Sequence, residues 1–269
     1  MAGRGIAVIV EDDDDIREAL GDVLRQSGFA VHATASGREG VEAVREHNPV
    51  LVTMDLGLPD FDGIEASRRI RIFSDAYLII VTGKGDEADA LMGFEAGADD
   101  FLTKPFRPRE LRARISAMLR RPRKQGVRES GTAAAPAEPA AAAVSSETAA
   151  AGDQNRSRSA ITCCDFEHHG LTLNEGTRTA EIDGTRIDLT RTQFDLLLVI
   201  MENGRLVRTK SDLVRRLRNE SYDTGSFVTT AEERAVEVHI GNLRKQLGDD
   251  SRAPRWLETV RGVGYRLTP

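Results

Sequence analysis

The sequence predicts a doubly wound α/β domain with a mostly parallel sheet, followed by a linker and a smaller α+β domain. Three observations predict this division. The first 120 residues repeat a short apolar run, a polar turn and a helical stretch; residues after 121 become rich in alanine and proline; and the last third has short strand-like pieces before three helical stretches and a hairpin. We therefore expect domains at 1–121 and 161–269, joined by residues 122–160.

Five apolar runs predict the strands of the first domain. They are IAVIV (6–10), FAVHA (29–33), VLVTM (50–54), YLIIV (77–81) and DFLT (100–103). Helical periodicity follows each run, as in IREALGDVLRQSG and RELRARISAMLRR. Parallel strands place their carboxyl ends on one edge of the sheet, where ligands of such sheets bind.

The segment at 122–160 has AAAPAEPAAAAVSSETAAAG at its centre. It lacks the apolar surface that would offset the entropy lost on ordering, and Pro136 and Pro139 argue against a long helix. We expect a flexible linker.

The last domain begins with strand-like pieces (LTLN, RTAEIDG, RIDL). A helix should follow in TRTQFDLLLVIMENG, because Thr190 and Gln193 form a capping-box pattern and Gly204 suits its end. Helices at KSDLVRRLR and AEERAVEVHIGNLRKQLG then precede a hairpin at WLETV and GYRLT. Three helices followed by a hairpin predict a winged helix.

Composition places the chain among globular proteins of the cytoplasm. It has 269 residues, of which 40% are apolar and 30% charged, and no apolar run approaches the ~18 residues of a membrane span. Cys163 and Cys164 are neighbours and cannot form a disulfide framework, which favours reduced thiols. We expect a cytoplasmic protein without a membrane partner.

Charge is distributed unevenly between the two ends. Residues 1–119 carry 14 basic and 22 acidic groups, whereas residues 234–269 carry 7 and 4. The acidic end should repel nucleic acid, and the basic end could contact it.

Polar residues follow four of the predicted strands on their common edge. Glu11 and Asp12 come after the first, Asp55 after the third, Thr82 after the fourth and Lys104 after the fifth. Clustered carboxylates need a cation to remain ionised together, and oxygen ligands suit Mg²⁺. With Mg²⁺ present, Asp55 could be a nucleophile toward a phosphoryl group whose oxygens Lys104 and Thr82 stabilise. By contrast, we interpret Asp13, Asp14 and Asp15 as acids that stabilise a helix N-terminus.

These motifs also resemble a known family. VIVEDDDDIREAL, MDLGLPDFDG, VTGKGD and EAGADDFLTKPF resemble the receiver domain of two-component response regulators, and residues 171–269 are similar to the DNA-binding domain of the OmpR/PhoB family. The resemblance implies a flavodoxin-like (βα)5 receiver and a winged helix-turn-helix domain. It implies a phosphorylation-controlled transcriptional regulator, whose only catalysis is phosphorylation and dephosphorylation of its own aspartate.

The resemblance also implies roles for individual residues. Asp55 would accept phosphate from a sensor histidine kinase. Asp12, Asp55 and the Gly57 carbonyl would bind Mg²⁺, which Glu11 assists through water. Thr82 and Phe101 would form a switch pair, and Lys104 would contact the phosphate, with a cis bond before Pro105.

A homodimer formed on phosphorylation is a further implication. The matching residues of its interface are Leu91, Phe94, Asp100, Glu110 and Arg114. Ala90 departs from the family pattern, because a basic partner for Glu110 is usual there. The segment RLRNESYDTGSFVTTAEE also departs from the usual Trp-Gly loop, which in this family contacts RNA polymerase.

Residues 231–247 predict a recognition helix. Val236, Ile240, Leu243 and Leu247 share one face and should be buried. Five residues then point outward: Arg234, Val238, Gly241, Asn242 and Lys245. With Arg261 in the Gly-flanked hairpin, this face predicts contact with tandem half-sites of promoter DNA. His239 matches a family position, but a structural histidine is an equally good interpretation.

Two other functions compete with this one. An aspartate-nucleophile phosphohydrolase would need a second acid two residues after Asp55, where Gly57 stands. A constitutive DNA-binding protein would use the receiver only as a scaffold, yet Asp12, Asp55, Thr82 and Lys104 are all present.

Overall fold

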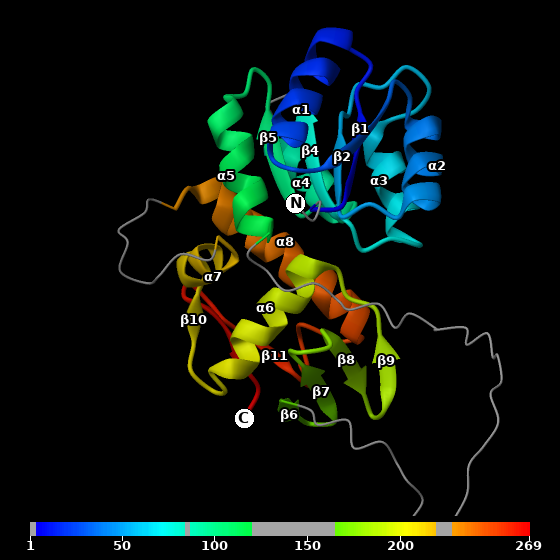
Figure 1. The fold of residues 1–269 in the computed structure, drawn as a ribbon. Helices are drawn as coiled ribbons and strands as arrows, with labels where there is room; N and C mark the ends of the chain where they lie inside the picture. The colour runs from blue at the N-terminus through cyan, green and yellow to red at the C-terminus, as the bar shows by residue number, and fades with distance from the viewer. Residues whose placement is uncertain (1–3, 84–86, 120–164, 219–227) are drawn as a thin grey trace, which may run out of the picture.

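The computed structural model describes residues 4–83, 87–119, 165–218 and 228–269, which form two domains (Figure 1). The expected linker at 122–160 lies outside these residues, as do residues 219–227 of the departing loop. The N-terminal domain lies at the top of Figure 1 and the C-terminal domain below it, with helix α8 of the lower domain between them.

The N-terminal domain is a five-stranded parallel sheet of order β2-β1-β3-β4-β5. Its strands are β1 (Ile6–Val10), β2 (Ala30–Thr34), β3 (Leu51–Met54), β4 (Tyr77–Thr82) and β5 (Asp100–Thr103). Its helices are α1 (Asp14–Gln26), α2 (Gly37–His47), α3 (Gly63–Arg71), α4 (Glu87–Glu95) and α5 (Pro108–Leu119). This is the doubly wound α/β fold that the five repeated units predict.

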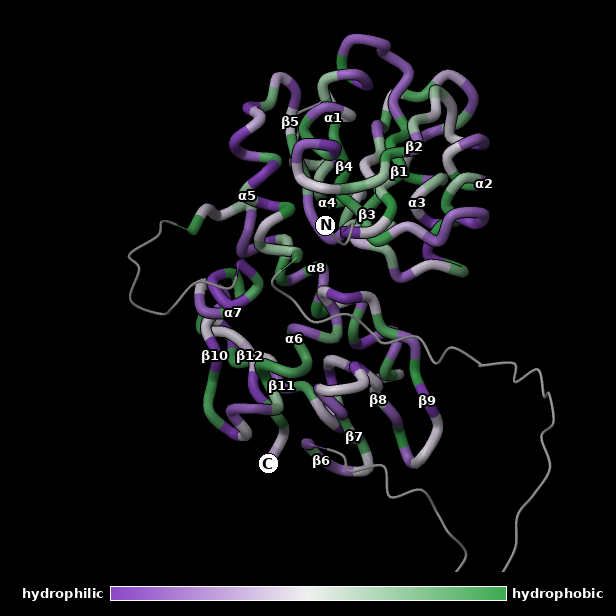
Figure 2. Tube along the Cα trace, in the orientation of Figure 1, coloured by the Kyte–Doolittle hydropathy of each residue, from purple (hydrophilic) through white to green (hydrophobic). Residues whose placement is uncertain are grey.

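Alternation along the strands builds a core on each face of this sheet. Ala7 and Ile9 of β1 belong to the cluster under α1 and α5, whereas Val8 and Val10 belong to the cluster under α2, α3 and α4. Both faces are therefore apolar, as the green tube of β1, β3 and β4 in Figure 2 shows.

An aspartate next to the acidic cluster begins α1. The side chain of Asp13 accepts a hydrogen bond from the Ile16 amide at 3.0 Å, and Asp14 and Asp15 lie in the first turn. The capping interpretation of this part of EDDDD is confirmed.

The C-terminal domain contains three helices and two small antiparallel sheets. One sheet has the order β6-β7-β8-β9 and the other β10-β12-β11. The strands are β6 (Phe166–His168), β7 (Leu171–Asn174), β8 (Thr179–Ile182), β9 (Thr185–Ile187), β10 (Arg208–Thr209), β11 (Leu257–Val260) and β12 (Gly264–Leu267). The helices are α6 (Arg191–Glu202), α7 (Lys210–Leu217) and α8 (Thr230–Leu247).

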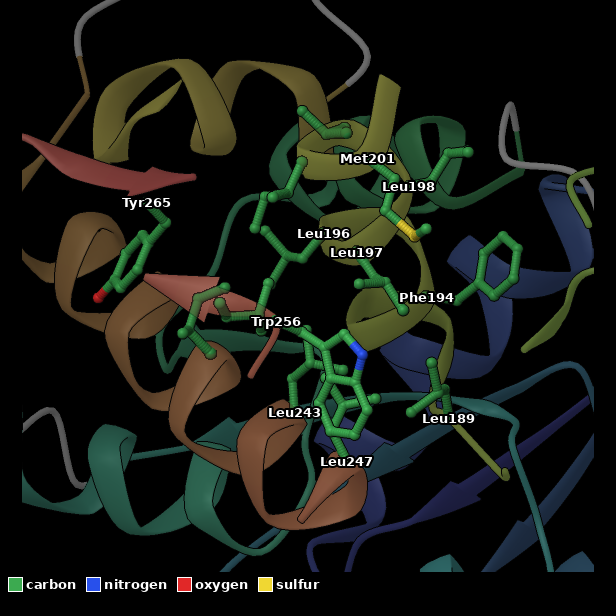
Figure 3. Close-up of a cluster of buried hydrophobic side chains, with 14 of the residues drawn as sticks. Leu189, Phe194, Leu196, Leu197, Leu198, Met201, Leu243, Leu247, Trp256 and Tyr265 are labelled. Atoms are coloured by element: carbon green, nitrogen blue, oxygen red, sulfur yellow. The ribbon is translucent and has the colours of Figure 1, made fainter. Parts of the chain in front are cut away.

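The core of this domain fixes how α8 is rotated. Val236, Ile240, Leu243 and Leu247 are all buried, as the periodicity predicts. Figure 3 shows the Trp256 ring beside Leu243 and Leu247. The predicted capping box of Thr190 and Gln193 is also present at the start of α6.

Among the described residues, none of the helices is both long and apolar enough to cross a membrane.

Candidate functional site

Three carboxylates meet at the carboxyl edge of the parallel sheet. Glu11 follows β1 and Asp55 follows the neighbouring strand β3, where the Asp55 amide donates to the Val10 carbonyl at 2.9 Å. Carboxylate oxygens of Glu11, Asp12 and Asp55 lie within 4.8 Å of one another. Glu11 is fully buried, Asp55 is 6% exposed and Asp12 is exposed. The topology thus brings Asp55 to two acids that come much earlier in the sequence, two strands and two helices before it.

Lys104 joins two of these carboxylates. Its Nζ donates to Glu11 Oε1 at 2.7 Å and to Asp55 Oδ2 at 2.9 Å. The backbone holds the lysine there, because its amide donates to the Thr82 carbonyl at 2.8 Å. The bond to Pro105 is cis, as the family resemblance implies. One ammonium therefore bridges two acids from different strands.

The charges of this cluster are strongly coupled. Burial raises the pKa of Glu11 to about 7; the hydrogen bond from Lys104 opposes this rise, and the nearby Asp55 carboxylate adds to it. Burial of Lys104 disfavours its charged form, but hydrogen bonds to Glu11 and Asp55 outweigh that effect and hold its pKa above the ordinary value. The site carries more negative charge than one ammonium can balance.

An unpaired oxygen shows that the cluster suits a cation. Among the described residues, Glu11 Oε2 is buried without a hydrogen-bond partner. Such an acceptor is costly unless a donor or a metal satisfies it. Glu11, Asp12 and Asp55 supply only oxygen ligands, which Mg²⁺ prefers. The acidic cluster is typical of a metal site.

Two glycines lie close to Asp55. A Cβ on Gly63, the first residue of α3, would lie 1.9 Å from the Asp55 carbonyl oxygen, so only glycine lets α3 start this close. A Cβ on Gly57 would lie 3.8 Å from Asp55 Oδ2, which places Gly57 beside the carboxylate. Asp55 Oδ1 accepts from the Leu56 amide at 2.7 Å. Sequence reasoning missed Gly63, although a glycine that opens the helical stretch in DFDG was a visible signal.

The predicted switch residues lie on the next two strands. Thr82 ends β4 and is 2% exposed. Phe101 of β5 is half-buried, packs against the core under α4, and lines a cavity of about 670 Å³ between the two domains.

The predicted dimer residues border the same cavity. Leu91, Phe94, Asp100, Glu110 and Arg114 all line it. The Arg114 guanidinium pairs with Asp100 and, at 3.1 Å, with Glu110. Within this chain the Arg114 guanidinium therefore already forms ion pairs with both carboxylates.

The outward face of α8 is divided between solvent and the N-terminal domain. Arg234 and Lys245 are exposed, as is Arg261 in the turn between β11 and β12. Val238 packs instead against the core of the N-terminal domain, and Asn242 Nδ2 donates to the Phe94 carbonyl at 2.9 Å. Periodicity correctly separated these residues from the core of their own domain, but it did not reveal this second contact.

His239 is nearly completely buried. Its ring meets the Phe94 ring edge-on, with centroids 5.1 Å apart. This packing favours the structural interpretation of His239 over a role in contacting DNA.

Comparison with known proteins finds a matching family for each of the two domains. Residues 7–116 match the response regulator receiver domain, and residues 184–267 match the C-terminal domain of transcriptional regulatory proteins. The transcriptional regulatory protein AfsQ1 of Streptomyces coelicolor is 34% identical over 97% of both chains. The DNA-binding response regulator MtrA of Mycolicibacterium smegmatis is 33% identical over 97% of this chain and 96% of its own. This chain belongs to the OmpR/PhoB family of response regulators.

Solved structures show the same fold. A mutant of RitR has a TM-score of 0.66 and 19% identity, covering 98% of this chain and 99% of its own.

Membership in the OmpR/PhoB family defines the general activity. The protein is a two-component response regulator that acts as a DNA-binding transcriptional regulator, and this family is not one of catalytic enzymes. Its receiver implies a histidine kinase as partner, and its C-terminal effector domain implies DNA. The phosphohydrolase alternative does not fit this family.

Proposed function

We propose that Asp55 is the phosphoacceptor and that its phosphorylation by a sensor histidine kinase controls DNA binding. The observation that carries the proposal is the nearly buried Asp55 carboxylate, which shares the Lys104 ammonium with Glu11 at the sheet edge. An Asp55 oxygen would attack the phosphorus of a phosphohistidine, and the P–N bond would break with its electron pair passing to the imidazole nitrogen. Lys104 would then move from carboxylate to phosphoryl oxygen, together with the Thr82 hydroxyl.

Mg²⁺ is the proposed cofactor. Asp12, Asp55 and the Gly57 carbonyl would hold it, with Glu11 assisting through water. Bound Mg²⁺ would neutralise charge on the carboxylates and the phosphoryl group. The orphaned Oε2 of Glu11 supports a cation at this position.

Phosphorylation would change the receiver face formed by α4, β5 and α5. Thr82 would approach the phosphate and Phe101 would turn inward, favouring a homodimer through Leu91, Phe94 and the pairing of Asp100, Glu110 and Arg114. Ala90 removes one expected ion pair. Exposed pairs contribute only about 0.2–1 kcal/mol each, so the dimer should be weakened and not prevented.

The effector domain would bind tandem half-sites of promoter DNA. The proposed contacts are Arg234, Val238, Asn242 and Lys245 on α8 and Arg261 in the wing. Asn242 suits adenine N6 and N7, and Val238 suits a thymine methyl group. RNA polymerase is the further proposed partner, and the family indicates the cytoplasm as the location. The proposed boundaries are 1–121 for the receiver, 122–160 for a linker and 161–269 for the effector.

Labelling with a small phosphodonor tests the phosphoacceptor. With Mg²⁺, the wild-type protein should gain one acid-stable, base-labile acyl phosphate, and Asp55→Asn should gain none. Asp60→Asn is the matched control, because Asp60 is an exposed aspartate of the same loop whose carboxylate accepts from the Gly37 and Arg38 amides. Labelling of Asp55→Asn at the wild-type level would refute the assignment. DNA binding that does not change on labelling would instead favour a constitutive DNA-binding protein.

A further inference from the structure

The side chain of Arg17 reaches back from α1 to the loop that carries two of the clustered acids. The loop is short, because β1 ends at Val10 and α1 begins at Asp14. Arg17 Nη1 donates to the Glu11 carbonyl at 2.8 Å and to the Asp12 carbonyl at 3.1 Å. One guanidinium nitrogen therefore holds two consecutive residues of the loop through their backbone.

These two carbonyls lie between the last hydrogen bond of the sheet and the first of the helix. The Glu11 amide donates to the Thr34 carbonyl at 3.1 Å, and the Arg17 amide donates to the Asp13 carbonyl at 2.9 Å. In the described part of the chain, no backbone amide donates to the Glu11 or Asp12 carbonyl. Because backbone carbonyls need a partner, the Arg17 side chain supplies what neither the strand nor the helix provides.

An ion pair keeps the guanidinium in this position. Arg17 Nη2 pairs with the Asp14 carboxylate, three residues earlier on the same helix. The fork of a guanidinium lets one nitrogen bond to the carbonyls while the other bonds to the carboxylate. The Arg17 side chain is only 21% exposed, which limits competition from water.

The loop needs this restraint because it carries charges that repel one another. Carboxylate oxygens of Glu11, Asp12 and Asp55 lie within 4.8 Å of one another. Lys104 holds the Glu11 carboxylate, whereas the Asp12 side chain is exposed and takes its position from the backbone of the loop. Mg²⁺ demands a near-octahedral arrangement of oxygens, so a displaced Asp12 would lower the affinity of the site.

We propose that Arg17 is a positioning residue that holds Glu11 and Asp12 in the arrangement that Mg²⁺ requires. Arg17 would not touch the cation, because a guanidinium offers only donors and carries positive charge. The inference rests on the proposed function in one respect, namely that Asp12 and Asp55 bind Mg²⁺ while Glu11 assists through water. It extends that proposal to a residue that supplies no ligand.

Charge and positioning predict opposite effects when Arg17 is replaced. Arg17→Met keeps an unbranched apolar chain but removes the donors and the positive charge. By charge alone, this loss beside an acidic site should strengthen the binding of Mg²⁺. By contrast, loss of a group that orients metal ligands typically weakens metal binding about 10- to 100-fold. Weaker binding by Arg17→Met would therefore come from positioning.

Isothermal titration calorimetry with magnesium chloride, at constant ionic strength, measures this affinity on the full chain without phosphodonor. The dissociation constant should rise about tenfold in Arg17→Met. Arg17→Lys keeps the charge but has a single nitrogen for the carbonyls and the carboxylate, and it should raise the constant about threefold. Arg25→Met is the matched control and should equal wild type, because Arg25 forms the same kind of pair with Asp22 in the last turns of α1.

The Mg²⁺ dependence of phosphoryl transfer gives a second measurement. With a small phosphodonor, the Mg²⁺ concentration that gives half the maximal rate should rise in Arg17→Met together with the dissociation constant. The rate at saturating Mg²⁺ should stay within about twofold of wild type, since the proposed role of Arg17 is in binding the cation and not in the transfer itself.

Each other result has a distinct meaning. A dissociation constant in Arg17→Met equal to or below that of wild type overturns the positioning role. An equal rise in Arg25→Met also overturns it, because the effect would then belong to the helix and not to the loop. If Arg17→Met does not fold, Arg17→Lys decides, and a wild-type constant overturns the proposal.

Failure of the proposed function gives different results. Wild-type protein that binds no Mg²⁺ contradicts the proposed cofactor, and the positioning role with it. Calorimetry without phosphodonor involves no phosphoryl transfer, so failure of the Asp55 assignment as phosphoacceptor would leave the comparison of Arg17→Met with Arg25→Met unaffected.

Discussion

At the carboxyl edge of the receiver sheet, charge is buried: Glu11 and Asp55 share the ammonium of Lys104 and have little contact with water. On the proposed DNA-binding face of the effector domain, Lys245 and Arg261 are exposed. Buried charges cost free energy unless they are paired, so their surroundings respond strongly when one partner changes. Exposed charges are solvated and affect folding little, but they remain available to a phosphate backbone. The receiver edge is thus suited to respond to a chemical change, and the effector face to bind a polyanion.

The largest expected effect tests the buried half of this comparison. Arg71→Ala should leave Asp99 as a buried carboxylate without its cation and lower the free energy of unfolding by about 3–5 kcal/mol. Arg69→Ala is the control on the same helix, because Arg69 forms an exposed pair with Glu65 that contributes about 1 kcal/mol or less. Urea unfolding followed by circular dichroism measures both. Equal losses in the two variants would contradict the distinction between buried and exposed charge.

The pH dependence of the free energy of unfolding tests the cost of the buried charge at Glu11. The pKa of Glu11 is raised to about 7 in the folded protein from an ordinary value of 4.5, so the folded state binds more protons than the unfolded state between these pH values. Without Mg²⁺, the free energy of unfolding should therefore fall as pH rises through this window, by at most about 1.4 kcal/mol per pH unit for one group.

Glu11→Gln isolates the contribution of this carboxyl. The variant cannot ionise at position 11, so its free energy of unfolding should lack this decline between the ordinary pKa of 4.5 and the raised value of about 7. Urea titrations at closely spaced pH values, in a chelating buffer, give both curves. If the two curves are parallel across the window, the pH dependence comes from other groups.

Sequence reasoning succeeded where chain topology alone decides the outcome. Glu11, Asp55 and Lys104 each follow a predicted strand, and a parallel sheet collects strand ends on one edge whatever the detailed packing. Periodicity likewise found the face of α8 that is buried in its own domain, including Leu243, since its apolar residues recur every three or four positions.

The contacts that were missed depend on two surfaces meeting across a long sequence separation. The Thr192 hydroxyl donates to Asp99 Oδ1, although the two residues are 93 positions apart, and the sequence around either residue does not predict this contact. Asn242 is polar and outward in its own domain, which is equally compatible with water, DNA or another domain. Gly63 was missed for a related reason: its value lies in the close approach of the Asp55 carbonyl, which is a property of packing. Patterns predict which residues share a face, and packing decides what covers it.

The smallest expected effect on folding tests the exposed half of the comparison. Arg261 is exposed in the wing, so Arg261→Ala should change the free energy of unfolding by no more than about 0.5 kcal/mol. It should nevertheless weaken DNA binding across sequences and lower the slope of log affinity against log salt by about 1, because one phosphate contact releases about one counterion. Arg252→Ala, at another exposed arginine of the effector domain, should leave the slope unchanged. Binding to random-sequence duplexes at several salt concentrations gives the slopes. If the Arg261→Ala slope equals that of wild type, the wing arginine does not contact the backbone, and the basic charge of this region must act through α8 alone.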